Sequence, residues 1–232
     1  MTIGIFGYDF SHYKTTEIVK NTFMNGHKIG AVFLAPKINY SNNGDVLNID
    51  NSELNKEIRV FCKNKSIQVF QTNHSNDELI GALVLQNNID IGLIGGARLI
   101  PEKVINLFEK GIINYHPGKV PETSGLDSFY RSIQSKIPLF VTAHLIDKRV
   151  DAGLFILESR VKIFLDDTPE AIKKRIILKQ VKLNHQVLNG IKEKSFNLES
   201  IVRPKKNEKL RLEEKEKIMK GFENWKHHVY DY

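Results

Sequence analysis

The chain has 232 residues, enough for one large domain or for one domain with a small appendage. Its hydrophobic content of 41% and charged content of 26% are those of an ordinary globular protein, and no apolar run is long enough to span a bilayer. The net charge of +7 favours an anionic partner, such as nucleic acid, a phosphorylated metabolite or a polyglutamylated cofactor.

The single cysteine, Cys62, excludes an intrachain disulfide and is typical of a reducing compartment. The chain opens directly into an apolar stretch at residues 3–7, without the basic region or cleavage site of a secretory signal. We therefore expect a cytoplasmic protein with no membrane partner.

Apolar runs typical of strands alternate with helical patterns through the first half of the chain. The predicted strands lie at residues 2–6, 31–34, 67–70, 89–94 and 111–116. The predicted helices lie at residues 14–25, 52–65, 75–87 and 101–110, capped at Ser52 and by a capping box of Ser75 and Glu78. This alternation predicts an α/β fold: a Rossmann-like, mostly parallel twisted sheet with helices on both faces.

The pattern changes after Gly125. A helix is expected at residues 126–136, followed by strands at 139–146, 154–157 and 160–164 that pair antiparallel at the edge of the sheet. Thr168 and Pro169 mark the start of a helix that continues to residue 192. The composition turns polar and basic from residue 203, which predicts a loosely attached segment; we divide the chain into a catalytic domain at 1–195 and a basic C-terminal appendage at 196–232.

The first predicted strand ends in a loop that leads into a helix. Gly4 and Gly7 lack the third glycine of a dinucleotide fingerprint, which makes that interpretation weak. A helix N-terminus favours anions, so residues of this loop are candidates for holding a phosphorylated substrate, although a plain strand-to-helix turn fits equally well. The candidates are Tyr8, Ser11, His12 and Lys14.

A second loop, with the adjacent glycines Gly95 and Gly96, follows the predicted strand at residues 89–94. Two glycines permit the close approach of a flat ligand, and open α/β sheets bind ligands at the carboxyl ends of their strands. A tight turn that needs small residues explains the same pattern.

The most informative motif is Asn114, His116 and Pro117 at the end of the strand at 111–116, with Asp151 after an antiparallel excursion. Side chains alternate along a strand, so Asn114 and His116 point the same way, and Pro117 ends the strand at the rim of the sheet. No serine or cysteine nucleophile stands out beside them, and the histidines lack the spacing of metal ligands. We interpret His144, inside an apolar strand, as a structural residue.

At these residues the chain resembles the folate-dependent formyltransferase family. The family has the pattern Asn-x-His-Pro, a later proline and glycine, and then Asp-x-Gly, and this sequence is similar to it at seven positions. These positions are Asn114, His116, Pro117, Pro121, Gly125, Asp151 and Gly153. The order of the predicted elements resembles that of the family over roughly residues 1–190.

The resemblance implies N10-formyltetrahydrofolate as the formyl donor, no metal, and catalysis by Asn114, His116 and Asp151. An amine would attack the formyl carbon, Asn114 and His116 would donate N–H groups to the developing oxyanion, and Asp151 would favour the charged imidazole and help to move the proton. The resemblance also implies that five residues line the pocket for the pterin of the folate: Arg98, Leu99, Ile100, Asp147 and Val150.

Departures from the family pattern narrow the expected acceptor. Asp9 would repel the phosphate of glycinamide ribonucleotide, and the residues after 190 are too few and too helical for the barrel domain of the tRNA-modifying members. Lys119 and Val120 replace the usual pair of leucines, which indicates specialised substrate contacts by Lys119. The chain is thus most similar to the nucleotide-sugar N-formyltransferases, which implies a nucleotide-linked amino sugar as partner, a role in surface polysaccharide biosynthesis and a possible homodimer.

Three alternatives remain. The protein would act on phosphoribosylglycinamide, hydrolyse formyltetrahydrofolate without an acceptor, or be a basic nucleic-acid-binding protein, although no recognisable nucleic-acid module supports the last. Six aromatic residues are candidates for stacking on a base, with ordinary packing the better interpretation of each: Tyr8, Phe10, Tyr13, Phe222, Trp225 and Tyr230.

Overall fold

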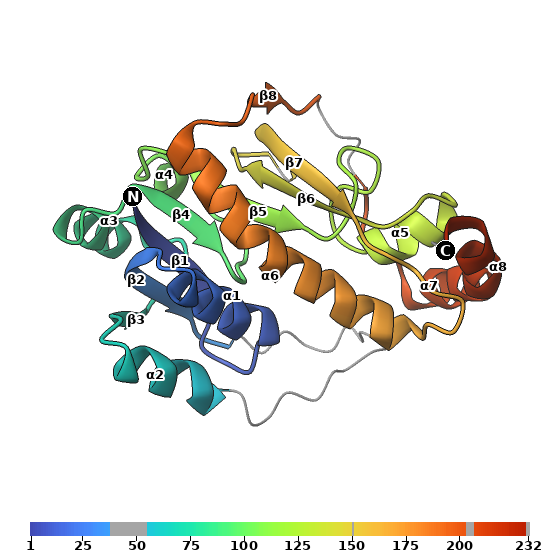
Figure 1. Ribbon diagram of the computed structural model, residues 1–232, viewed down its shortest axis with the longest axis horizontal. Coiled ribbons are helices and arrows are strands. Elements are labelled where there is room, and N and C mark those ends of the chain that lie inside the picture. The colour runs from blue at the N-terminus through green and yellow to red at the C-terminus, as the bar shows by residue number, and fades with distance from the viewer. Residues whose placement is uncertain (38–54, 150, 203–206, 231–232) are drawn as a thin grey trace.

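The protein is built on one eight-stranded sheet with the strand order β3-β2-β1-β4-β5-β6-β7-β8. Figure 1 shows the computed structural model, which describes residues 1–37, 55–149, 151–202 and 207–230. Ser52, the expected cap of the second helix, lies outside the described residues. This arrangement confirms the predicted α/β class.

The first five strands are parallel to one another and alternate with helices. These elements are β1 (Thr2–Tyr8), α1 (Tyr13–Met24), β2 (Lys28–Ala35), α2 (Asn55–Asn64), β3 (Val69–Gln71), α3 (Asp77–Gln86), β4 (Ile91–Ile94), α4 (Glu102–Ile105) and β5 (Ile112–His116). The last three strands pair antiparallel, as expected for the edge of the sheet. The remaining elements are α5 (Ser128–Gln134), β6 (Phe140–Leu145), β7 (Leu154–Arg160), α6 (Pro169–Glu193), β8 (Glu199–Ser200), α7 (Leu212–Met219) and α8 (Phe222–Val229).

Helices cover both faces of the sheet because successive strand residues are apolar on both sides. On one face, Ile5, Val32 and Tyr115 belong to a core that includes residues of α1 and the long helix α6 (Figure 1). On the other face, Phe33 and Ile112 pack with residues of α3 and α4. The alternation along β5 therefore sets Ile112, Asn114 and His116 on the face that carries α3 and α4.

Several element ends differ from the sequence-based expectation. Asn76 rather than Ser75 caps α3, since its side chain accepts a hydrogen bond from the N–H of Leu79. The helix after Pro101 ends at Ile105 instead of residue 110. In place of the two strands expected at 154–157 and 160–164, the structure has one continuous strand, β7, which ends at Arg160. Residues 161–164 do not belong to a strand.

The C-terminal segment is not loosely attached, and that expectation is wrong. Trp225 of α8 is 2% exposed, packs near Phe129 and Phe222, and donates from its indole N–H to the carbonyl of Ile137 at 2.9 Å. The buried ammonium of Lys215 on α7 pairs with Asp127 at 2.8 Å. Phe222 and Trp225 are therefore core residues, as the packing interpretation of these rings predicted.

Among the described helices, none is both long and apolar enough to cross a membrane.

We predict that Trp225→Ala lowers the free energy of unfolding by about 3–5 kcal/mol, because it empties the largest buried side-chain site of the core. Denaturant unfolding followed by circular dichroism measures this change. Leu212→Ala on α7 is the matched control, since Leu212 is 48% exposed and its truncation should cost less than about 0.5 kcal/mol. Equal stability of wild type and Trp225→Ala would show that α8 does not contribute to the core.

Candidate active site

His116 ends β5 and is held between two acceptors. Its Nδ1 lies 3.3 Å from a carboxylate oxygen of Asp151, and its Nε2 lies 2.9 Å from the backbone carbonyl of Thr123. A carbonyl and a carboxylate both accept hydrogen bonds, so this geometry favours a ring with a proton on each nitrogen. His116 is 3% exposed, so these two contacts occupy both ring nitrogens in a site that is almost closed to solvent.

The same geometry bears on the predicted role of His116 as an oxyanion donor. Both ring nitrogens already have an acceptor in this structure. Before Nε2 can donate to an oxyanion, its hydrogen bond to the carbonyl of Thr123 must break and be replaced by one to the substrate oxygen. The donor role of His116 therefore stays a prediction.

Asp151 connects two loops. Its backbone has a positive φ of 47°, and its carboxylate accepts a hydrogen bond from the backbone N–H of Gly125. Burial opposes ionisation, but the hydrogen bond and charge of His116 outweigh it and lower the pKa of Asp151 below its ordinary value. Asp151 is thus a carboxylate at neutral pH, which matches the charge state that the predicted role needs.

Asn114 is held by His144, its partner across the antiparallel pair of β5 and β6. The His144 Nδ1–H donates to the carbonyl of Ala152 at 2.9 Å, which leaves Nε2 as an acceptor for the Asn114 amide at 3.2 Å. Burial lowers the pKa of His144, so the ring is neutral. One N–H of the Asn114 amide is committed to His144, and this fixes which way the amide group faces.

The loop between β5 and α5 is held to the sheet by side-chain hydrogen bonds. The Thr142 hydroxyl donates to the carbonyl of Gly118 at 2.7 Å, and the Ser128 hydroxyl donates to the carbonyl of Pro117 at 2.6 Å. These bonds keep the carbonyl of Thr123 and the N–H of Gly125 in place around His116 and Asp151. Lys119, a predicted substrate contact, pairs with Glu122 at 3.1 Å and lies over the ring of Phe140.

The loop between β1 and α1 carries a cluster of rings. Tyr8 and Phe10 stack with their centroids 4.6 Å apart, and His12 approaches Tyr8 edge-on at 5.0 Å. His12 also caps α1, since its Nδ1 accepts from the N–H of Thr15. Burial, with a contribution from Lys14, lowers the pKa of His12 to about 4, so this ring is neutral.

Lys14 brings the β1–α1 loop next to β5. Its ammonium donates to the carbonyl of Tyr115 at 3.2 Å, between Asn114 and His116 in the sequence. Burial lowers the pKa of Lys14 to about 8, and no carboxylate in the described part of the chain pairs with it. Ser11, in the same loop, has a buried hydroxyl oxygen with no hydrogen-bond partner among the described residues.

The charge of Asp9 is compensated. The guanidinium of Arg59 on α2 makes two hydrogen bonds to this carboxylate, at 2.9 and 2.7 Å. The expectation that Asp9 repels a phosphate is therefore weakened, because a cation from a distant part of the sequence offsets it.

The glycine loop after β4 packs against the start of α1. A Cβ at Gly96 would lie 2.7 Å from the ring of His12, which supports the interpretation of this glycine as a packing requirement. The Arg98 guanidinium donates to the carbonyl of Pro36 at 2.7 Å and lies over the ring of Tyr8. Arg98 is thus directed toward the β1–α1 loop, whereas Leu99 is 79% exposed and Ile100 is buried.

The loop after β6 holds the other two residues expected to bind the cofactor. Asp147 pairs with Arg149 of the same loop, and this pairing lowers the pKa of Asp147. Ile146 packs in the core on the face that also holds Ile100, so the loops after β4 and β6 share that face of the sheet. Val150 lies outside the described residues.

Three contacts were missed by the sequence interpretation: the bond of His144 to Asn114, the carbonyl of Thr123 on His116, and the pair of Arg59 and Asp9. The first had a signal in the sequence, because a histidine within an apolar strand needs a polar partner. Among the described residues, no cluster of three or more His, Cys, Asp and Glu side chains is placed to hold a metal ion.

Comparisons with known proteins agree on one family. Residues 16–188 match the family described as formyl transferase. The phosphoribosylglycinamide formyltransferase of Haemophilus influenzae is 28% identical over 108 residues, which cover 46% of this chain and 51% of that protein. The chain therefore spans about half the length of this relative.

Solved structures share the fold at low identity. A glycinamide ribonucleotide transformylase of Symbiobacterium toebii superposes with a TM-score of 0.66 and 16% identity, covering 88% of this chain and 94% of that one. A 4-N formyltransferase of Francisella tularensis superposes with a TM-score of 0.61 and 18% identity, covering 89% and 75%. The match over residues 16–188 places this chain in the formyl transferase family.

Proposed function

We propose that this protein transfers a formyl group from N10-formyltetrahydrofolate to the amino group of a nucleotide-linked amino sugar, such as a 4-amino-4,6-dideoxy sugar. The observation that carries formyl transfer is the cluster of Asn114, His116 and Asp151 within a chain that belongs to the formyl transferase family. The amino-sugar acceptor rests on the residues of the β1–α1 loop.

The cluster supplies what formyl transfer requires. The formyl oxygen gains negative charge as an amine attacks its carbon, and an N–H of Asn114 together with the positive charge of His116 stabilises that charge. The Asp151 carboxylate lies 3.3 Å from Nδ1 of His116, where an anion favours positive charge on the imidazole. After the amine has attacked, the same carboxylate is the base that we assign to the proton lost by the amine nitrogen, directly or through water. The oxyanion then collapses, the bond between the formyl carbon and N10 breaks, and tetrahydrofolate leaves with a proton on N10.

The residues expected to bind the folate offer an apolar edge beside this cluster. Leu99, in the loop after β4, is 79% exposed, and Ile100 and Ile146 belong to the core on the face of the sheet that carries Asn114 and His116. An exposed leucine over a packed apolar base suits the flat pterin ring. Arg98 fits this role less well, because its guanidinium is turned toward Pro36 and Tyr8.

The acceptor side favours a nucleotide-linked sugar. The stacked rings of Tyr8 and Phe10 and the guanidinium of Arg98 over Tyr8 form a flat, cationic surface next to Lys14. Rings suit a nucleotide base or the apolar face of a sugar, and the uncompensated ammonium of Lys14 suits a phosphate. A solved structure described as a sugar N-formyltransferase, from a Shewanella species, shares the same fold.

Phosphoribosylglycinamide is the second candidate acceptor. The relative from Haemophilus influenzae carries that activity in its name, and Arg59 offsets the charge of Asp9 that would otherwise repel a phosphate. Both candidates combine an amine with a phosphate, so the reaction at Asn114 and His116 is the same for each.

The acceptor is tested by incubating the protein with N10-formyltetrahydrofolate and a panel of amines, followed by mass spectrometry of the products. The panel contains 3-amino and 4-amino nucleotide sugars and phosphoribosylglycinamide. We expect a product heavier by one formyl group with a nucleotide sugar. Formylation of phosphoribosylglycinamide alone would overturn the proposed acceptor, and formate release without any acceptor would show a hydrolase.

We predict that Lys14→Met raises the KM for the acceptor by about tenfold or more, because it removes a charge-assisted contact with the phosphate. The KM for the formyl donor should stay unchanged. Lys28→Met on β2 is the matched control, since Lys28 is exposed on the first residue of β2, away from the β1–α1 loop. An unchanged acceptor KM in Lys14→Met would show that Lys14 does not bind the acceptor.

We predict that His144→Leu lowers kcat by about tenfold, because the amide of Asn114 loses the acceptor that orients it. His144→Gln keeps an acceptor oxygen and should retain more of the rate than His144→Leu. Steady-state kinetics gives kcat and KM, and thermal unfolding shows whether both variants are equally folded. If the two variants lose the same rate at equal stability, His144 does not position Asn114.

A further inference from the structure

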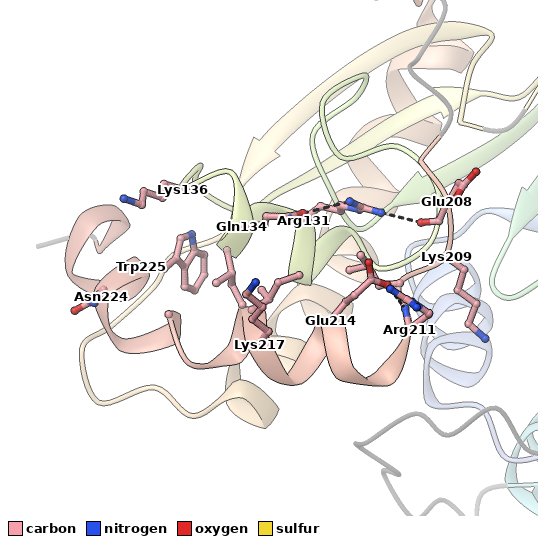
Figure 2. Close-up of a pocket in the computed structure, with 14 residues that line it drawn as sticks. Arg131, Gln134, Lys136, Glu208, Lys209, Arg211, Glu214, Lys217, Asn224 and Trp225 are labelled. Atoms are coloured by element: carbon pink, nitrogen blue, oxygen red, sulfur yellow. Dashed lines mark hydrogen bonds and ion pairs between the residues drawn. The ribbon is translucent and has the colours of Figure 1, made fainter.

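A groove lies between α5 and the two C-terminal helices, away from the candidate active site. Its volume is about 790 Å³, which is within the range of pockets for small ligands and cofactors, about 300–1,000 Å³. Of the residues that the sequence analysis considers for substrate contacts, Trp225 is the one that lines the groove, and its ring is part of the core. Figure 2 shows how Arg131 from α5 and Arg211, Glu214 and Lys217 from the C-terminal segment line the groove.

The lining of the groove is strongly basic. Five cationic side chains line it against two carboxylates, those of Glu208 and Glu214. Glu214 is already paired with Arg211, at 3.3 Å. In the part of the chain that the structure describes, no carboxylate forms an ion pair with the other four cations, which are Arg131, Lys136, Lys209 and Lys217. Uncompensated charges of one sign in a concave surface attract counter-charged ligands.

Arg131 is fixed in position for binding. Its guanidinium donates to the carbonyl of Glu208 at 2.8 Å and to the side-chain oxygen of Gln134 at 3.2 Å (Figure 2). Both acceptors are uncharged groups. The Glu214 carboxylate is held mainly by the N–H and side chain of Arg211, which lower its pKa, and the charge of Arg131 adds to that shift. The Nε of Arg131 is buried and has no hydrogen-bond partner among the described residues. A guanidinium held in this way is pre-organised for an anion with oxygens in a plane or fork.

The distribution of cations indicates the class of ligand. An arginine on α5 and lysines at positions 136, 209 and 217 surround a space larger than a single phosphate or carboxylate needs. A ligand with several linked negative charges contacts more of them at once. Phosphate oxygens match both the fork of arginine and the point charge of lysine. We propose that this groove binds a phosphoanhydride anion, such as a nucleoside diphosphate.

The groove adjoins the loop that carries part of the active site. Asn207 donates to the carbonyl of Ser124 at 2.8 Å, and the N–H of Leu210 donates to the carboxylate of Asp127 at 2.9 Å. Gly125, between these two anchor points, donates to Asp151. A ligand in the groove therefore contacts the segment at 208–211, which is hydrogen-bonded to this loop through Leu210.

Titration calorimetry of the full chain with inorganic pyrophosphate and with ADP, at an ionic strength of about 0.15 M, tests the site. No formyl donor is present, so no transfer occurs, and the variants assign the binding to the groove or to the candidate active site. We expect saturable binding, weakened about tenfold or more in the double variant Lys209→Gln/Lys217→Gln, because each charge contributes to holding the phosphates.

Two controls separate this groove from other basic surfaces. Lys174→Gln/Lys182→Gln removes two exposed charges from α6 and should leave the affinity unchanged. Lys14→Met removes the cation proposed to hold the acceptor phosphate, so it reports binding at the candidate active site; loss of the measured binding in Lys14→Met but not in Lys209→Gln/Lys217→Gln would place the anion there and overturn the proposal. Wild-type affinity in Lys209→Gln/Lys217→Gln, no saturable binding by the wild-type chain, or displacement of pyrophosphate by a lower concentration of a single-stranded oligonucleotide would each overturn the proposal.

Discussion

The contact between Asp151 and His116 holds the candidate active site together, because it joins three parts of the chain. His116 belongs to the end of β5, Asp151 to the turn before β7, and Gly125, the second partner of the carboxylate, to the loop before α5. The carboxylate is buried, so it is stable only with these donors around it. Its charge in turn favours positive charge on the neighbouring imidazole of His116.

The sheet explains why these parts meet. β5 is the last parallel strand, and β6 pairs with it in the antiparallel sense. This register sets Asn114 opposite His144 and His116 opposite Thr142, so each of the two residues at the end of β5 has a polar neighbour on β6. His144 orients the amide of Asn114, and Thr142 holds the loop that turns back over His116. The change of strand direction thus provides the polar support that a wholly apolar parallel strand would lack.

The sequence was sufficient to predict the alternating α/β half and the sharing of one face by Asn114 and His116. Those predictions rest on local periodicity and on Pro117, which act over a few residues. The partners of these groups were not predictable in the same way. The bonds of His144 to Asn114 and of Arg59 to Asp9 join residues 30 and 50 positions apart, and they depend on strand register and helix placement.

For the C-terminal segment, the sequence interpretation underestimated how much of the segment is buried. Its mixed charges were interpreted as a solvated, loosely attached surface, yet Lys215 and Lys226 are buried and hydrogen-bonded, and Trp225 and Phe222 complete the core beside Phe129. Long basic side chains cover apolar surface with their stems while their ammonium groups reach oxygens, so composition alone underestimates burial. The same helices leave an excess of positive charge on the groove that they form with α5.

The most direct test of the central claim is the rate of single-turnover formyl transfer by wild type and by Asp151→Asn. The substitution keeps the size of the side chain and removes its charge. The structure predicts a rate lower by about 10² or more, as in the loss of a group that stabilises a transition-state charge, with folate binding retained. A rate in Asp151→Asn close to that of the wild type, at equal stability, would contradict the assignment of this cluster as the site of transfer.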